Sequence, residues 1–330
     1  MEEGQVQSLL GKLTQLKSEI GKVIVGQEAI VEEILVAMLA GGHCLLEGVP
    51  GLAKTLMVRT LSQALSLSFR RIQFTPDLMP TDILGTEVLE EDHTTGRRFF
   101  KFVKGPLFAN IVLADEINRT PPKTQSALLE AMQEFEITYA GQTYPLDRPF
   151  FILATQNPIE QAGTYPLPEA QLDRFLLYVK IGYPSADEET AILSNTTGSK
   201  KPVVNAVVGG EEIKALQALV RGVSISDDLV RYVAELIRAT RPDTSGHAYV
   251  KEWVRWGAGP RAGQALILTA KARALFQQRY AVVMEDIYAM ACPVLRHRIL
   301  MNFKAEAEGI NSDDVAKHLI KEVARPSGRL

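Results

Sequence analysis

The sequence predicts an α/β fold, in which helices cover both faces of a parallel sheet, followed by an all-helical domain. Short apolar runs of strand length recur through the first half of the chain and alternate with segments of helical periodicity, which is typical of a parallel sheet. A glycine-rich loop joins the first of these runs to a helix. Beyond about residue 186 only helical periodicity remains. We therefore expect two domains, 1–184 and 185–330.

The composition is that of a chain with a large core, and it excludes several protein classes. Of the 330 residues 46% are apolar, which is enough to fill the cores of two domains. The net charge of −3 argues against bulk attraction to nucleic acid, so we do not expect a nucleic-acid partner. Cys44 and Cys292 show neither metal-site nor CxxC spacing, which fits a reducing compartment. Without a signal-peptide pattern or a long apolar run, we expect a cytoplasmic protein with no membrane span.

The elements of the sheet domain follow from periodicity and from punctuation by glycine and proline. Apolar residues three and four apart predict helices at 5–20, 28–40, 56–67, 121–134 and in a short piece from 168. Apolar or alternating runs predict strands at 44–46, 69–74, 110–116, 150–155 and 175–181. Alternating segments around turn residues predict two inserted hairpins, 86–91 with 97–103 and 137–139 with 143–146.

The first of these hairpins carries charges of both signs. Its cations are Arg97, Arg98, Lys101 and Lys104, and the carboxylates near them are Glu87, Glu90, Glu91 and Asp92. Because the two sets balance, we favour a solvated face over a nucleic-acid contact, which stays open as the alternative.

The second domain begins with a segment that favours a loop. Residues 194–210 are rich in glycine, serine and lysine, and we expect a linker there. Helical periodicity then predicts helices at 211–221, 227–239, 260–278, 284–300 and 312–324. Ser226 and Ser312, each followed by an aspartate, are typical residues at the start of a helix.

The glycine-rich loop, Gly48 to Thr55, has the layout of a phosphate-binding loop between a strand and a helix. In such a loop backbone N–H groups surround the phosphates, Lys54 reaches the β- and γ-phosphates, and the Thr55 hydroxyl holds Mg²⁺. A plain turn is the alternative, and the strand before the loop argues against it. Ala53 stands where the usual pattern has glycine. Since alanine disfavours positive φ, we expect a right-handed backbone there.

Further polar residues follow the ends of two other apolar strands. Asp115 can hold the metal through its water shell, and Glu116 can act as general base toward water. The Asn157 amide can bond both the γ-phosphate and the water, although a turn residue before Pro158 is an equal alternative. Because the carboxyl ends of parallel strands share one edge, these residues and the loop should meet there.

Six motifs in order resemble the MoxR family of AAA+ ATPases, over about residues 20–300. They are Gly26-Gln27, Gly48–Thr55, Asp115–Arg119, Ala154–Pro158, Leu167–Phe175 and Gly259–Ala262. Alanine before the loop lysine is usual in that family, so Ala53 supports the resemblance. It implies a P-loop NTPase core of three layers with a C-terminal helical lid, and it relates the two hairpins to inserts shared with magnesium chelatase and the MCM helicases.

The resemblance also implies roles for single residues. It makes Lys54 and Thr55 Walker A, Asp115 and Glu116 Walker B, Asn157 sensor 1, Arg174 an arginine finger for the neighbouring subunit, and Arg261 sensor 2. The residues expected to bind ATP are Gly26, Gln27, Gly48, Val49, Pro50, Gly51, Leu52, Ala53, Lys54, Thr55 and Leu56, with Gly26 and Gln27 beside the adenine. The expected ligands of Mg²⁺ are Thr55 and Asp115. Without the motifs, we would interpret Arg174 as a residue of a surface helix and Arg261 as an exposed residue at the start of a helix.

The expected function is Mg²⁺-dependent ATP hydrolysis by a ring, a homo-hexamer. By resemblance the ring remodels client proteins or matures metal centres, often with a von Willebrand factor A partner, and the client itself is unknown. The alternatives are an MCM-like nucleic-acid translocase and a scaffold that binds ATP with negligible turnover.

Overall fold

The structure is a computed structural model that describes residues 3–49, 51–91, 93–94, 96–157, 163–197 and 202–325. Pro50, which we expect in the phosphate-binding loop, lies outside these residues, as do Asp92 and Thr95 of the first hairpin turn and Pro158 of the fourth motif.

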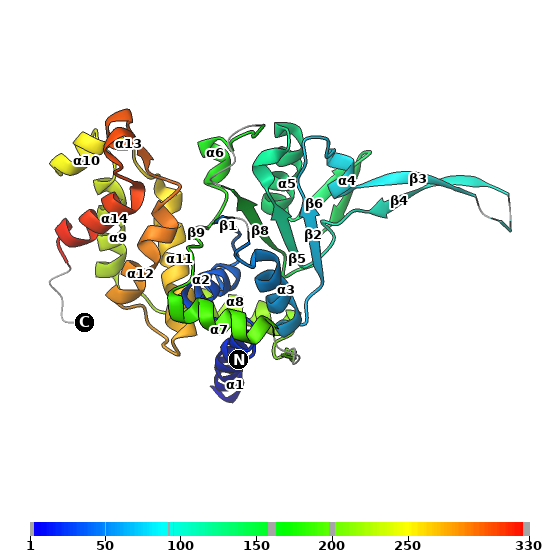
Figure 1. Cartoon of the computed structure of the whole chain (residues 1–330), viewed down its shortest axis with the longest axis horizontal. Helices are drawn as coiled ribbons and strands as arrows, with labels where there is room; N and C mark the ends of the chain where they lie inside the picture. The colour runs from blue at the N-terminus through cyan, green and yellow to red at the C-terminus, as the bar shows by residue number, and fades with distance from the viewer. Residues whose placement is uncertain are drawn as a thin grey trace.

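The centre of the molecule is a five-stranded parallel sheet in the order β2-β5-β8-β1-β9 (Figure 1). Its strands are β1 (Cys44–Glu47), β2 (Phe69–Gln73), β5 (Ile111–Asp115), β8 (Phe151–Gln156) and β9 (Leu177–Lys180). Their residues are almost continuously buried in β1, β5 and β8, because helices cover both faces. The predicted parallel sheet is confirmed.

Successive residues of the strands point into two separate cores, as the two-residue period of a strand requires. In β5, Ile111 and Leu113 belong to one apolar cluster, and Val112 and Ala114 belong to the other. The first cluster includes residues of α1 (Glu3–Gly21), α2 (Glu28–Leu39) and α3 (Lys54–Ala64), and the second includes α4 (Pro80–Leu84) and α5 (Pro122–Glu134). The sheet is therefore the middle of three layers. A further short helix, α6 (Glu169–Leu172), precedes β9.

Both predicted hairpins are present. The first pairs β3 (Gly85–Glu91) with β4 (Arg98–Lys104), and the second pairs β6 (Glu136–Tyr139) with β7 (Gln142–Pro145). The β3–β4 ribbon projects far from the rest of the molecule (Figure 1). Near its base the Phe102 ring stacks on Tyr144 of the second hairpin, with 4.2 Å between ring centroids. Stacked rings add to the stability of a two-stranded ribbon that is marginal by itself.

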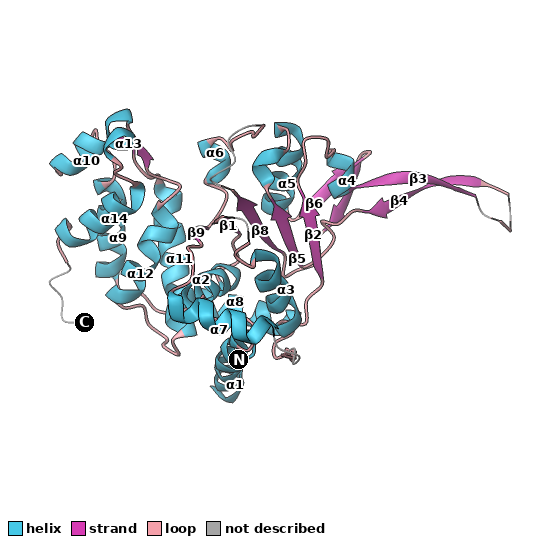
Figure 2. Ribbon diagram, in the orientation of Figure 1, coloured by secondary structure: helices cyan, strands magenta, loops and turns pink. Residues whose placement is uncertain are grey.

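The C-terminal part is helical, with one small antiparallel pair (Figure 2). Its helices are α7 (Ala186–Thr197), α8 (Gly210–Gly222), α9 (Asp227–Ala239), α10 (Ala248–Trp253), α11 (Pro260–Phe276), α12 (Met284–Leu295), α13 (Phe303–Glu308) and α14 (Ser312–Glu322). The pair joins β10 (Val254–Trp256) to β11 (Leu300–Met301). As expected, Ser226 caps α9, and α14 begins at Ser312 with Asn311 as its cap.

Three expectations for this part were incomplete. The first residues of the predicted linker belong to α7. Ser194 fits in this helix because its hydroxyl donates a hydrogen bond to Thr190 O, one turn earlier, at 2.9 Å. Helix α12 ends at Leu295 rather than at residue 300. The short elements α10, α13, β10 and β11 were missed, because six or fewer residues carry little periodicity.

The helical part packs directly on the sheet part. Helix α11 lies against α2, α8, α9 and α12, and α12 also contacts β9. These contacts make the first apolar cluster continuous across the helical part. Among the helices that the structure describes, none combines the length and the apolar character needed to cross a membrane.

Candidate functional site

A cavity of about 360 Å³ lies at the carboxyl edge of the sheet, and we call it the loop cavity. Its lining comes from the turn after β1, the start of α3 and the residues that follow β5 and β8. The lining residues are Gly51, Leu52, Ala53, Lys54, Thr55, Leu56, Arg71, Asp115, Glu116 and Asn157. The structure therefore brings together the polar residues that the sequence placed at three strand ends.

Ala53 has a left-handed backbone, with φ 54° and ψ 24°. The expectation of a right-handed conformation was wrong. Residue 53 is the turn between the loop and α3, and the chain must change direction there so that Lys54 can begin the helix. For a residue with a Cβ this backbone costs about 1–2 kcal/mol, which alanine bears with the smallest possible side chain.

Lys54 is half-buried at the centre of the loop cavity. Its Nζ donates to Gly48 O at 2.5 Å, across the loop. Burial lowers the pKa of the Lys54 ammonium, while Asp115, Glu116 and Glu47 oppose that shift. A lysine held in this way places a positive charge in the loop cavity, which suits an anion with several negative charges.

Asp115 is held by two neighbours. Thr155 Oγ1 donates to its Oδ1 at 2.6 Å, and Arg71 donates to its Oδ2 through Nη2 at 2.6 Å and Nε at 3.1 Å. Arg71 comes from β2 and was missed by sequence reasoning. The pairing of β2 with β5 brings Arg71 beside Asp115, and no local pattern in the sequence predicts that pairing.

Glu116 has a left-handed backbone as well, with φ 58°. Its N–H donates to Thr155 Oγ1 at 2.9 Å, and its Oε2 accepts from Gln73 Nε2 at 2.7 Å and from Arg119 Nη1 at 3.1 Å. These bonds fix the direction of the carboxylate. Asn157, only 6% exposed, lines the same cavity.

The donor set of the loop cavity fits a magnesium nucleotide. Thr55 and Asp115 offer hard oxygen ligands, as Mg²⁺ prefers, and Lys54 offers a cation for phosphate. Within the described part of the chain no three His, Cys, Asp or Glu side chains gather as a metal-ion site. A protein that supplies one or two ligands, and leaves the others to phosphate and water, matches the usual way in which Mg²⁺ is bound.

Arg174 and Arg261 lie elsewhere. Both line a second cavity, of about 520 Å³, which we call the arginine cavity. Its lining includes residues 41–43, directly before β1, and residues 173–176, directly before β9. It therefore opens at the amino edge of the sheet. The two edges are separated by the length of a strand, about 13 Å for four residues. That Arg174 precedes a strand was visible in the sequence and already pointed to this edge.

Gly26 and Gln27, which we expect beside the adenine, are placed separately from the loop cavity. Gly26 has φ 75°, and a Cβ on it would clash with the side chain of Glu188 from α7. Gln27 is buried, and its Oε1 has no hydrogen-bond partner among the residues described. An unsatisfied buried acceptor suits a ligand that donates, such as an amino group. Neither these residues nor Gly48 and Val49 line the loop cavity.

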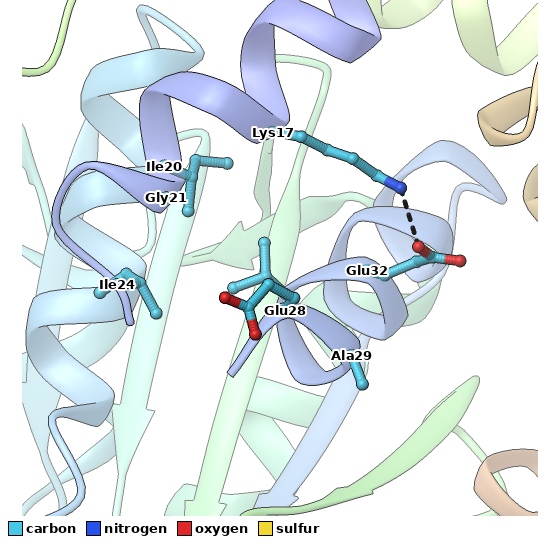
Figure 3. A pocket seen from close by; sticks show the side chains of 8 residues that line it. Lys17, Ile20, Gly21, Ile24, Glu28, Ala29 and Glu32 are labelled. Atoms are coloured by element: carbon cyan, nitrogen blue, oxygen red, sulfur yellow. Dashed lines mark hydrogen bonds and ion pairs between the residues drawn. The ribbon is translucent and has the colours of Figure 1, made fainter. Parts of the chain in front are cut away.

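A third, smaller cavity of about 140 Å³ lies between the end of α1 and the start of α2 (Figure 3). Ile20 and Ile24 line it, and the Lys17–Glu32 ion pair of 2.9 Å lies at one side. None of the expected site residues lines this cavity.

Comparison with known proteins gives consistent matches. A family model described as "ATPase family associated with various cellular activities (AAA)" matches residues 43–177, and one described as "AAA lid domain" matches residues 247–319. The chain is 44% identical to "Chaperone MoxR1" of Mycobacterium tuberculosis, over 93% of this chain and 81% of that protein. It is 43% identical to "Uncharacterized protein YeaC" of Bacillus subtilis, over 97% and 96%. A crystal structure from Cytophaga hutchinsonii is similar with TM-score 0.90 and 42% identity, over 98% and 97% of the two chains.

Proposed function

The chain belongs to the MoxR family of AAA+ ATPases, and we propose that it binds ATP with Mg²⁺ in the loop cavity and hydrolyses it. The observation that carries this proposal is the convergence of Lys54, Glu116 and Asn157, from three separate segments, on one cavity of nucleotide-binding chemistry. We also propose that residues 1–184 are the ATPase core and residues 185–330 the lid.

The polar residues expected from the sequence each have a role in this proposal. Lys54 and the loop N–H groups hold the phosphates, and Thr55 with Asp115 would hold Mg²⁺, which when bound neutralises charge on the phosphate oxygens. Glu116 accepts the proton of the attacking water, and its fixed bonds to Gln73 and Arg119 favour one orientation. Asn157 orients the water and the γ-phosphate through its amide. Gly26 and Gln27 contact the base.

We propose that Arg174 and Arg261 act on the nucleotide of the neighbouring subunit. Their position at the amino edge supports this, because they line a cavity a strand's length from the loop of their own chain. A guanidinium suits the charge that develops on a transferred phosphoryl group. A subunit whose amino edge meets the carboxyl edge of the next forms a head-to-tail contact, which closes into a ring. We propose a homo-hexamer.

The work of this ring is proposed to be chaperone-like. The name of the relative "Chaperone MoxR1" supports remodelling of a client protein. Maturation of a metal centre and a von Willebrand factor A partner stay part of the proposal. A nucleic-acid translocase finds less support. Two of the four cations of the projecting hairpin pair with its own carboxylates, Arg98 with Glu91 at 3.1 Å and Lys101 with Glu90 at 3.0 Å.

The catalytic proposal is tested with Glu116→Gln. We expect ATP turnover to fall at least about tenfold while ATP affinity stays within about threefold, because the amide keeps the shape and cannot accept the proton. Glu130→Gln, at an exposed position of the adjacent helix α5, is the matched control and should keep normal turnover. Equal turnover of Glu116→Gln and wild type would refute the role of Glu116, and negligible turnover of the wild type would favour the scaffold.

The shared site is tested by mixing two variants. Arg174→Ala lacks the finger and Glu116→Gln lacks the base, so each alone should turn over ATP at least about tenfold more slowly than wild type. In mixed rings the Glu116→Gln subunit offers an intact finger to the intact base of its neighbour. Activity should therefore exceed the sum of the two variants. Full activity of Arg174→Ala alone would show that the finger assignment is wrong.

A further inference from the structure

We propose that Arg298 is a positioning residue for Arg174, and that it acts by clamping the segment Asp173–Leu176 to the end of α12. This inference rests on the proposed function, because a fixed Arg174 matters only if it reaches the nucleotide of a neighbour. It assigns to Arg298, which also lines the arginine cavity, a role in hydrolysis through the placement of Arg174.

The contacts of Arg298 lie on both sides of Arg174. Its Nε donates to Asp173 Oδ1 at 2.8 Å, before Arg174 in the chain. Its Nη2 donates to Phe175 O at 2.7 Å, and its Nη1 donates to Leu176 O at 3.1 Å, both after Arg174. The backbone of the finger is thus gripped from either side, while the side chain of Arg174 itself lines the arginine cavity.

The grip is rigid because Arg298 is itself fixed. Its side chain is 4% exposed, and Nη1 also donates to Val294 O, in the last turn of α12, at 2.5 Å. The N–H donors of a planar guanidinium point in fixed directions. Arg298 can therefore donate to the Asp173 carboxylate and to the carbonyls of Phe175 and Leu176 in one orientation only. The ammonium of a lysine is a single point and cannot reach all three. Next to it, His297 Nε2 lies 3.0 Å from Phe175 O and adds a further contact to the same carbonyl.

Asp173 extends this clamp to the second arginine of the cavity. Its Oδ1 accepts from Arg298, and its Oδ2 pairs with Arg261 Nη1 at 3.5 Å. Arg261 is the second residue of α11, and Arg298 follows the end of α12, so one carboxylate joins the finger segment to two places in the helical part. Asp173 thus links the segment that carries Arg174 to both Arg298 and Arg261.

The first test is Arg298→Lys, which keeps the buried charge and removes the fork. We expect ATP turnover to fall about tenfold or more, as for loss of the finger itself, while ATP affinity stays within about twofold. Arg273→Lys is the matched control. Arg273 also belongs to the helical part and pairs with Asp286 at 2.6 Å, but it makes no contact with residues 173–176, so its variant should keep turnover within about twofold of wild type.

Two further measurements separate positioning from a general loss of stability. In a double-mutant cycle, Arg298→Lys should cost little more once Arg174→Ala is present, because the finger is already absent, whereas a structural defect would add to it. Mixed with Glu116→Gln, the Arg298→Lys variant should regain activity, since its own loop cavity is intact. An additive loss, or no recovery on mixing, would overturn the proposal.

A different pattern marks failure of the proposed function. If Arg174→Ala turns over ATP at the wild-type rate, the finger assignment fails, and the role of Arg298 fails with it. If Arg174→Ala is impaired and Arg298→Lys is not, only the positioning role is overturned. Should Arg298→Lys not fold, as judged by circular dichroism, Asp173→Asn replaces it. It keeps the shape and removes the charge shared by both arginines, and the same cycle and mixing results are expected.

Discussion

The side-chain amide of Gln73 donates a hydrogen bond of 2.7 Å to Glu116 Oε2. Gln73 is the last residue of β2, and in the sheet it lies beside Asp115. The edge strand β2 therefore provides, through Gln73, a hydrogen bond to the Glu116 carboxylate, which follows the end of β5 and which we propose as general base. The orientation of Glu116 is set by two segments distant in sequence, β2 and the residues around Thr155.

Removal of this bond should slow hydrolysis. We expect Gln73→Ala to lower kcat about tenfold, because a hydrogen bond to a charged group contributes about 1.5 kcal/mol, and to leave KM for ATP unchanged. Steady-state kinetics measure both. Arg70→Ala, at an exposed position of the same strand, is the control and should keep the normal kcat. A variant with changed KM and normal kcat would show that Gln73 serves nucleotide binding instead.

Glycine in place of Ala53 should relieve backbone strain. The left-handed conformation at φ 54° costs alanine about 1–2 kcal/mol, and glycine adopts it freely. Since glycine also makes the unfolded chain more flexible, we expect Ala53→Gly to raise the free energy of unfolding by up to about 1 kcal/mol. Urea denaturation without nucleotide measures it. Ala127→Gly, in the interior of α5, should have the opposite sign and lose about 1 kcal/mol. If both variants lost the same amount of unfolding free energy, the claim that the backbone of Ala53 is strained would be wrong.

The projecting hairpin should not make the ATPase sensitive to nucleic acid. Arg98 and Lys101 form ion pairs across the ribbon with Glu91 and Glu90, so the face offers little net positive charge to phosphate. We expect single- and double-stranded DNA and RNA to change ATP turnover by less than about twofold at physiological salt. Reversal of Arg97, Arg98 and Lys101 to glutamate should also leave basal turnover normal. Stimulation by DNA or RNA that this reversal abolishes would instead favour the translocase.

Acid should destabilise the fold through His43. This residue is buried, its Nδ1 accepts from the Ile152 N–H at 3.0 Å, and its Nε2 lies 3.0 Å from Met132 O. Burial lowers the pKa of the imidazole from 6.5 to about 4. Between those values the unfolded chain binds the proton and the folded chain does not. The contribution of His43 to stability is therefore full above pH 6.5, falls by up to about 3 kcal/mol as the pH decreases toward 4, and then levels off.

Urea denaturation at several pH values between 7 and 4 checks this, with the pH range set by the cited pKa. His43→Gln should make the dependence shallower, because it removes one of the groups that titrate. Burial also lowers the pKa of His297, which adds to the loss of stability in acid, whereas burial raises the pKa of Glu33 to about 7, which opposes that loss. His93→Gln changes an exposed histidine in the hairpin turn and should leave the wild-type slope. If His43→Gln kept that slope too, the acid effect would belong to other groups.

Local patterns in the sequence predicted most of the sheet part. The strands that form the sheet, the two hairpins and the helices around them have either the right period or turn residues at their ends, and both signals are local. The same held for the loop, Asp115-Glu116 and Asn157, because residues that follow parallel strands must share an edge. The backbone conformation of Ala53 was predicted wrongly. Alanine by itself prefers a negative φ, but the path of the loop into α3 requires a positive one. The short elements of the helical part were missed since few residues carry little pattern.

By itself the sequence determined the α/β class, the parallel sheet and the helical C-terminal part, and it predicted that Gly48–Thr55 binds phosphate. The tertiary structure decided which side chains surround that chemistry. Arg71 and Gln73 reach Asp115 and Glu116 because β2 pairs with β5, and Arg298 reaches Asp173 because α12 packs beside β9. It also put Arg174 and Arg261 in one cavity at the edge opposite the loop. The physical reason is common to all of these. Strand order and helix docking are set by the burial of whole apolar faces, and that burial is a property of the entire chain, not of any segment within it.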